Sequence, residues 1–456
     1  MKANSELLYG LHDIPTKQQS ITAATQHILA CFVGIITPTL IIGGTLGLQA
    51  ELPYLLSMAL FVSGVATFIQ AKTIGPIGSG LIAVQGTSFS FVSAILVAGF
   101  AIKAKGGSNA DVLATIFGVC LLGAFIEVVI SQFITKVRRI VTPLTTGIVI
   151  TTIGFSLIKV GMTDLAGGFG SDTFGDTQNL YIGIFVLITI IVLNLSSNPW
   201  IRLSAIMVGM GLGSLLAYWL GIISVEHIGE QPLFSVPVPF KYGLNFDIEV
   251  FLPVALIYLM TALESSGDLT ANSLFCGLPI KGEQYLKRIK GGILADGVNS
   301  ALASVFNTFP NTTFGQNNAV IQLTGVASRH VGFYIAAILV LLGLFPIVGG
   351  VLQSIPKPVL GGATLVMFAT IAVAGIKILA SEPIDRRKTL IMATSFGAGF
   401  GVLMEPNALQ GLPEALRNIF SSAITTAGVI AIVMSVLIPE PKAELTHEEA
   451  KLPSRS

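Results

Sequence analysis

The chain has 456 residues, of which 52% are hydrophobic and 11% are charged, and its formal net charge is +1. Because roughly a quarter of the residues of a soluble protein are charged, this composition excludes a soluble globular domain and predicts an integral membrane protein. The near-neutral balance gives no electrostatic basis for a nucleic-acid partner.

Neither the N-terminus nor the cysteines indicate a secreted protein. Residues 1–20 are polar and precede the first apolar run, so no cleaved signal peptide is predicted and the first helix is expected to direct insertion. Cys31, Cys120 and Cys276 have neither disulfide-framework nor metal-site spacing, so we expect them to be small core residues.

Apolar stretches recur along the whole chain at the length of a membrane-spanning helix. An α-helix needs about 20 residues to cross roughly 30 Å of hydrocarbon, and this window predicts about fourteen spans. In chain order they cover residues 24–46, 52–71, 78–99, 111–134, 140–160, 180–196, 201–222, 248–270, 286–307, 311–327, 331–351, 357–379, 387–404 and 417–438. The predicted fold class is an all-α polytopic membrane protein.

The distribution of charge predicts the orientation. Short cytoplasmic loops collect Lys and Arg. With a cytoplasmic N-terminus, the inner connections contain Arg138, Arg139 and Lys281, whereas the outer connection 160–179 is acidic and has no Lys or Arg. An even number of spans with both termini in the cytoplasm is therefore expected.

The long polar connection at about 223–246 divides the spans into seven plus seven. An odd number per half predicts an inverted repeat, in which interrupted spans at matching positions form the binding site near the membrane midplane. The third span contains "GPIGSGLIAVQGTSFSF" (75–91) and the tenth contains "PNTTFGQNNAVIQLTG" (310–325), and both are interrupted. Irregular backbone at this depth requires protein or a water-filled cavity around it. The alternative is that 310–318 is an exposed loop and that the helix begins at Ala319.

Carboxylates within the predicted spans are functional candidates, because each costs about 2.5–3.5 kcal/mol to insert at the centre of a membrane helix. Glu264 and Asp268 lie one turn apart on one helix face, so their repulsion favours a proton on at least one of them. Alternatively, Asp268 faces water or pairs with a lysine of the following loop. Asp296 is flanked by small residues and has a structural role as its alternative, and Glu127 is assigned no role.

His27 lies in the first predicted span and is either a hydrogen-bonded packing residue or a proton carrier. No catalytic motif or metal-binding motif is found, so the sequence does not predict an enzyme.

Five separated blocks resemble the nucleobase–ascorbate transporter (nucleobase:cation symporter) family, and are most similar to its bacterial xanthine permeases. In chain order the blocks are "TQHILACFVGIITPTLI" (25–41), "GSGLIAVQGTSFSFV" (78–92), "ALESSGDLTA" (262–271), "KGGILADG" (290–297) and "TTFGQNNAVIQLTGVASRHVG" (312–332). Two residues depart from the family pattern. Ala319 replaces an expected Gly, and Ser88 replaces the usual Asn, a change associated with tolerance of uric acid.

The resemblance implies fourteen helices in a core domain and a gate domain, with short strands in the broken third and tenth spans. The tails would be 1–20 and 441–456, the core 21–135 and 245–355, and the gate 136–225 and 356–440. Family members are homodimers in the bacterial inner membrane that move the core against the gate, and the bacterial ones are proton symporters without another cofactor.

The same resemblance implies roles for individual residues. Glu264 and Gln316 would hold the purine, with Ser88, Phe89 and Asn317 lining or shaping the pocket, whereas Asp268, Asp296 and His27 would join Glu264 in proton coupling. Residue chemistry agrees, since a carboxylate accepts paired N–H groups and a primary amide both donates and accepts. A uric acid permease is the nearest alternative. An anion transporter of the same architecture and a membrane enzyme are more remote.

Overall fold

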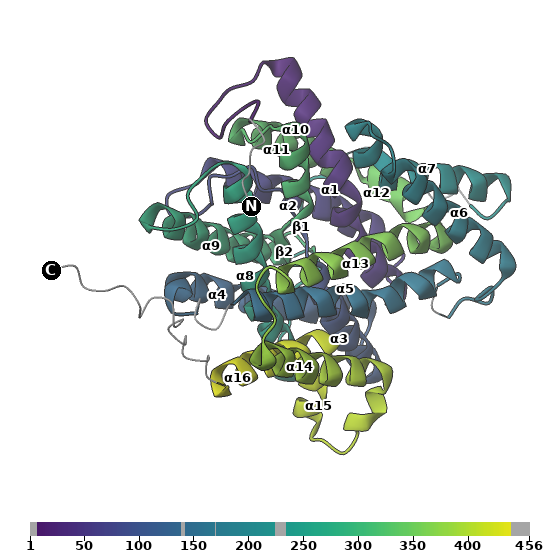
Figure 1. Ribbon diagram of the computed structural model, residues 1–456. Coiled ribbons are helices and arrows are strands. Elements are labelled where there is room, and N and C mark those ends of the chain that lie inside the picture. The colour runs from purple at the N-terminus through teal and green to yellow at the C-terminus, as the bar shows by residue number, and fades with distance from the viewer. Residues whose placement is uncertain (1–6, 138–141, 169, 224–233, 439–456) are drawn as a thin grey trace.

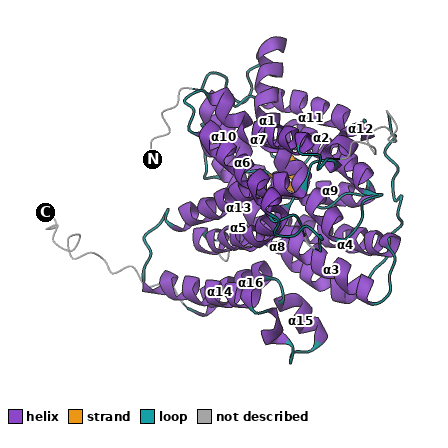
Figure 2. Ribbon diagram, turned by 90° about the vertical axis from the view of Figure 1, so that its right-hand side faces the viewer, coloured by secondary structure: helices purple, strands orange, loops and turns teal. Residues whose placement is uncertain are grey.

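The computed structural model describes residues 7–137, 142–168, 170–223 and 234–438, which form an almost entirely helical protein (Figures 1 and 2). Its helices are α1 (Lys17–Thr45), α2 (Leu52–Lys72), α3 (Val92–Ala104), α4 (Asn109–Val137), α5 (Pro143–Leu165), α6 (Thr177–Asn194), α7 (Pro199–Trp219), α8 (Ile248–Phe275), α9 (Glu283–Val305), α10 (Gln316–Thr324), α11 (Arg329–Gly343), α12 (Pro346–Gln353), α13 (Lys357–Leu379), α14 (Arg386–Met404), α15 (Glu414–Phe420) and α16 (Ala423–Leu437). The 3-10 turns η1 (Phe89–Phe91) and η3 (Pro406–Leu409) and the strands β1 (Gln85–Thr87) and β2 (Asn311–Thr313) complete the described elements.

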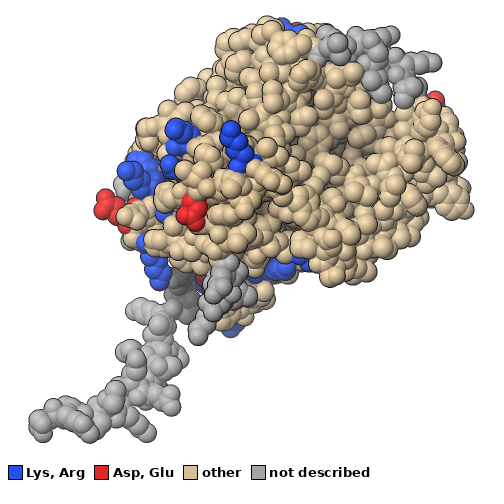
Figure 3. Space-filling model, turned by 90° about the horizontal axis from the view of Figure 1, so that it is seen from above, with Lys and Arg blue, Asp and Glu red and all other residues tan. Residues whose placement is uncertain are grey.

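Within the described ranges, eight helices are long and apolar enough to cross a membrane, or nine if the bent pair α11 and α12 is one span. The eight are α1, α2, α4, α5, α6, α7, α8 and α13. Of the other predicted spans, α3 has 13 residues and α10 has 9, whereas α9 with 23 and α14 with 19 are long enough but are not among the helices of sufficient hydropathy. Figure 3 shows one face on which Lys and Arg gather toward one end while most of the remaining surface is uncharged. The protein is therefore an all-helical, multi-pass membrane protein.

Apart from the interrupted third and tenth spans, most helix boundaries agree with the predicted spans, but three differ. Helix α1 begins at Lys17 rather than at residue 24, because the Thr16 hydroxyl and the Gln19 side chain form a reciprocal capping box there. The stretch 331–351 is not one straight helix: α11 and α12 meet at an angle of 78°, just before Pro346. The last predicted span, 417–438, is divided between α15 and α16.

The two strands lie at the centre of the helical assembly in both ribbon views (Figures 1 and 2). They are antiparallel, with Gln85 opposite Thr313 and Thr87 opposite Asn311. Strand β1 leads into η1 and α3, and β2 leads into α10, so both predicted interruptions are real. Residues 311–314 are buried and α10 starts at Gln316, so the alternative of an exposed loop with a helix from Ala319 is wrong.

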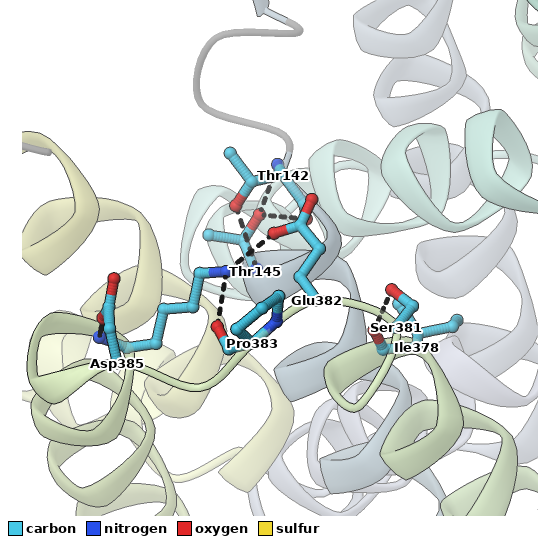
Figure 4. Close-up of polar contacts among 8 residues, drawn as sticks. Thr142, Thr145, Ile378, Ser381, Glu382, Pro383 and Asp385 are labelled. Atoms are coloured by element: carbon cyan, nitrogen blue, oxygen red, sulfur yellow. Dashed lines mark hydrogen bonds and ion pairs between the residues drawn. The ribbon is translucent and has the colours of Figure 1, made fainter. Parts of the chain in front are cut away.

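The helices surround the strand pair unequally. Helices α5 and α13 lie side by side in both ribbon views, and α14 and α16 form a further layer against α5 (Figures 1 and 2). Figure 4 shows Glu382, in the connection after α13, pointing toward Thr142 and Thr145 at the start of α5. Lys388 of α14 donates to Glu382 Oε2 at 2.8 Å. This polar cluster links the ends of α5, α13 and α14.

Residues 7–13, predicted to be part of a tail, form a strap that is hydrogen-bonded to residues 325–328 after α10. Gly325 O accepts the backbone N–H of Leu8 at 2.9 Å, and Tyr9 O accepts that of Ala327 at 2.9 Å. The Ser328 hydroxyl donates to the carbonyl of Asp13 at 2.6 Å. The strap therefore holds the turn that follows α10. The remainder of the predicted tails, residues 1–6 and 441–456, lies outside the described residues.

Candidate functional site

The antiparallel pair β1 and β2 forms the scaffold of the site. Its ladder is extended at both ends, because Ser88 N–H donates to Pro310 O at 2.8 Å and Phe314 N–H donates to Val84 O at 2.9 Å. Within the membrane interior an isolated strand leaves its backbone N–H and C=O groups without hydrogen bonds. Strands β1 and β2 pair with each other and so satisfy these groups. Because the strands are antiparallel, η1 and α3 begin at one end of the ladder and α10 begins at the other, so both helices start beside the strand pair.

Glu264 lies on α8 at the entrance to α3. The Ser90 hydroxyl, within η1, donates to Glu264 Oε2 at 2.9 Å. The neighbouring Phe89 packs edge-to-face against Phe368 of α13, with ring centroids 5.5 Å apart. Consecutive residues of η1 thus contact Glu264 and Phe368, and the Phe89 ring lies at the boundary between η1 and α13.

Asp268 lies one turn further along α8, against the start of α10. A Cβ placed on Gly315 would be 2.7 Å from Asp268 Oδ1, and the Asn318 amide donates to the backbone carbonyl of Asp268 at 3.1 Å. No ion pair joins Asp268 to a lysine of the α8–α9 connection among the described side chains. The carboxylate therefore faces the same interhelical junction as Gln316.

The Gln316 amide is half-buried at the first position of α10, and it forms no hydrogen bond with the described part of the chain. Its donor and acceptor are therefore free to meet a ligand. Asn317, the next residue, is fully buried and its amide donates to the carbonyl of Ile82. Asn317 thus holds the segment before β1 and contributes to the shape of the site.

His27 and Ser88 are both buried, and neither has a satisfied side chain among the described residues. Both ring nitrogens of His27, which lies beside Asn317, lack a hydrogen-bond partner there, as does the Ser88 hydroxyl. A buried polar group without a partner is unfavourable by about 1–3 kcal/mol. These groups mark a polar interior along α1 and the end of β1.

Asp296 lies behind the strands, fully buried on α9. It accepts hydrogen bonds from Gln70 Nε2 at 2.8 Å and from the Thr313 hydroxyl at 3.2 Å. Gln70 also donates to Gly292 O and accepts from Ser79 N–H, both at 2.9 Å. Asp296 therefore belongs to a network that connects α2, α9 and β2.

Glu127 has a partner that the sequence did not reveal. Its buried carboxyl group lies 2.6 Å from the Thr261 hydroxyl, one turn before Glu264 on α8. Gly297 permits this packing, because a Cβ at that position would be 3.1 Å from Glu127 Cβ. Glu127, Glu264 and Asp296 thus come from three helices that pack together, α4, α8 and α9.

Gln70 and Thr313 were not singled out by sequence reasoning. Gln70 occupies an otherwise apolar stretch of α2, and a buried amide in a membrane span is a signal that could have identified it. Thr313 is an ordinary residue in strands and carries no such signal. In the described part of the chain, no group of three His, Cys, Asp or Glu side chains is arranged to hold a metal ion.

Comparison with solved structures shows the fold. The transmembrane domain of the cyanobacterial bicarbonate transporter BicA superposes with a TM-score of 0.56 at 11% identity, covering 93% of this chain and 99% of that one. The murine anion transporter Slc26a9, in its inward-facing state, gives 0.60 at 12% identity, covering 93% and 69%. At such low identity the likeness concerns architecture alone.

Sequence relatives are much more similar. Xanthine permease XanP of Escherichia coli (strain K12) is 48% identical over 444 residues, which cover 96% of each chain. Xanthine permease XanQ of the same strain is 43% identical over 441 residues, covering 96% of this chain and 95% of its own. Uric acid permease PucJ of Bacillus subtilis (strain 168) is 31% identical over 441 residues, covering 95% of each chain.

A sequence profile described as the permease family matches residues 18–408. Together with full-length relatives at 43% and 48% identity, this match identifies the family. The chain belongs to the permease family, the same nucleobase–ascorbate transporter family that its sequence blocks resemble.

Proposed function

We propose that the protein is a proton-coupled symporter that imports a purine base, xanthine, across the bacterial cytoplasmic membrane. The observation that carries the proposal is the position of Glu264 and Gln316 where two interrupted spans meet: Glu264 accepts from Ser90, and the Gln316 amide is free. The two relatives called xanthine permeases, at 48% and 43% identity, support the same substrate.

The chemistry of a xanthine edge matches these two side chains. The base presents N–H donors beside C=O acceptors in one plane, so a carboxylate at Glu264 accepts N–H groups while the Gln316 amide donates to a carbonyl and accepts from an N–H. Phe89 stacks on the ring, with a contribution of about 1–3 kcal/mol. Asn317 shapes the pocket through its bond to Ile82, and Ser88 lines it.

The proposed architecture is a 7+7 inverted repeat with fourteen crossings. The third crossing comprises β1, η1 and α3, and the tenth comprises β2 and α10. The core would be 21–135 and 245–355, the gate would be 136–225 and 356–440, and both termini would be cytoplasmic. Residues 138–141 and 224–233 within these ranges lie outside the described residues. Two such chains would form a homodimer in which each core moves against a fixed gate surrounded by lipid.

Proton coupling is assigned to the carboxylates around the strand pair. Glu264 and Asp268 share one face of α8, and Asp296 lies behind β2 with His27 on the α1 side. Several carboxylates in a water-poor interior cannot all be ionised, so one of them carries the proton while another meets the base. A neutral base and one proton carry one positive charge inward, which gains about 2.3 kcal/mol per 100 mV of membrane potential.

A second substrate, uric acid, is favoured by one observation. The Ser88 side chain is small and its buried hydroxyl has no partner among the described residues. A hydroxyl at this position leaves room and a donor for the additional oxygen of urate. The uric acid permease relative at 31% identity is compatible with this extension.

Uptake of labelled xanthine into proteoliposomes with an acidic exterior tests the proposal. We expect accumulation above the external concentration, abolished by a protonophore and reduced by unlabelled urate in proportion to its affinity. Equal uptake with and without the gradient would reject proton coupling, and no uptake of any purine would reject the substrate class.

The variant Glu264→Gln tests the coupling residue. Uphill accumulation should be lost, while exchange of internal for external base is partly retained because exchange needs no net proton movement. Glu382→Gln, in the polar cluster of Figure 4 and remote from the strands, is the matched control and should accumulate xanthine normally. Wild-type uphill uptake by Glu264→Gln would remove Glu264 from the coupling step.

A further inference from the structure

A cavity of about 260 Å³ lies away from the strand pair, between the strap, α1, α7 and the end of α10. Tyr9 of the strap and Trp200 of α7 contribute aromatic rings, and Gln19, Gln26 and Thr324 contribute polar groups. Gln26 is half-buried and forms no hydrogen bond with the described residues, so both ends of its amide are available.

The lining excludes a charged occupant. Among the described residues that line the cavity there is no Asp, Glu, Lys, Arg or His. A phospholipid headgroup or a free anion would need a cationic partner, and none is present in this lining. Aromatic rings beside uncharged amides are instead typical of sites for neutral planar heterocycles, which stack on the rings and bond to the amides at their edge.

The cavity is lined by two of the helices that also carry main-site residues, α1 and α10. Leu323 and Thr324 in its wall are on α10, about two turns or 10 Å along the helix from Gln316. On α1, Gln26 directly precedes His27. The cavity therefore lies on the side of the strand pair that faces the N-terminal strap, which is the side on which we place the exit of the base.

We infer that this cavity is a second purine-binding site, an exit vestibule where the neutral base pauses between Trp200 and Gln26 before release. The inference rests on the proposed function, because it takes the transported base as the ligand. The walls come from the core segments α1 and α10 on one side and from α7 on the other, so an occupant bridges the two proposed domains.

The two tryptophans of the chain allow a direct test. Trp219→Phe leaves Trp200 as the sole tryptophan, and its emission is titrated with xanthine using the full-length protein in lipid nanodiscs. Saturable quenching is expected, and its half-maximal xanthine concentration should stay unchanged when Gln316→Ala weakens the main site about tenfold. Trp200→Phe is the matched control, because Trp219 is 80% exposed at the opposite end of α7 and should show no saturable quenching.

The amide is tested by Gln26→Leu in the Trp219→Phe background. We expect at least a tenfold increase in the xanthine concentration needed for half-maximal quenching, whereas Gln18→Leu, an exposed position of α1 outside the cavity, leaves it unchanged. A half-maximal concentration that rises about tenfold with Gln316→Ala would overturn the inference, since Trp200 would then report only the main site. Xanthine uptake by Trp219→Phe separates the two proposals. If this variant takes up xanthine but its Trp200 quenching depends on Gln316, the second site is rejected while the proposed transport function stands.

Discussion

Gln70→Leu is expected to destabilise the protein strongly, although the substitution adds an apolar residue to a membrane helix. The Gln70 amide satisfies three buried groups: Ser79 N–H and Gly292 O at 2.9 Å each, and Asp296 Oδ1 at 2.8 Å. Leucine leaves Ser79 N–H without its partner, whereas Asp296 Oδ1 keeps the Thr313 hydroxyl at 3.2 Å. Because a buried polar group left unsatisfied is unfavourable by about 1–3 kcal/mol, the free energy of unfolding should fall by about that amount.

The assay measures the melting temperature of the purified protein: samples are heated to a series of temperatures, and the fraction that remains folded is measured by size-exclusion chromatography. Gln353→Leu is the matched control, because Gln353 Nε2 donates a single exposed bond to Gln49 O at 2.9 Å, and its loss should change stability by about 1 kcal/mol or less. Melting temperatures that are equal in the two variants would show that the Gln70 network does not hold α2, α9 and β2 together.

Three further outcomes are expected. Gln316→Ala should raise the KM for xanthine about tenfold through lost edge contacts, measured as initial uptake rates, and an unchanged KM would remove Gln316 from the pocket. Ser88→Asn should narrow uptake toward xanthine, measured as weaker competition by urate; equal competition would contradict the role of the hydroxyl. Gly86→Ala should lower thermal stability by about 1–3 kcal/mol, because the new Cβ would lie 2.5 Å from Phe314 Cζ. Gly211→Ala, with open space around it, is the control for that loss.

Sequence reasoning predicted the membrane class, most helix boundaries and both interruptions. These features follow from local patterns: hydrophobic length sets the helices, and the polar, Gly-containing stretches 75–91 and 310–325 could not continue as apolar helices. Gln316 was singled out because an amide is unusual in such a stretch, and the structure places it at the first position of α10. The bend before Pro346 was missed although the proline was visible, since hydropathy alone reports length and not direction.

The network behind the strands could not be derived in the same way. The Asp296–Gln70 and Glu127–Thr261 contacts join residues more than a hundred positions apart, and the pairing depends on how α2, α4, α8 and α9 pack. Glu127 illustrates the limit, because a buried carboxyl group predicts that a partner exists without indicating which helix supplies it. Asn317, expected to line or shape the pocket, donates to the Ile82 carbonyl, a partner 235 positions away that the sequence does not indicate.

The strand pair also bears on how the protein is made. Gln85 and Thr313 are 228 positions apart, so when the ribosome has produced the first strand, its partner does not yet exist. Until the later segment arrives, the earlier half-span has exposed peptide groups that lipid cannot satisfy. During biogenesis this early segment must therefore stay hydrated or bound to a chaperone until β2 is made. In a nascent chain arrested before residue 311, a cysteine introduced at Gln85 or Thr87 should react with a water-soluble thiol reagent.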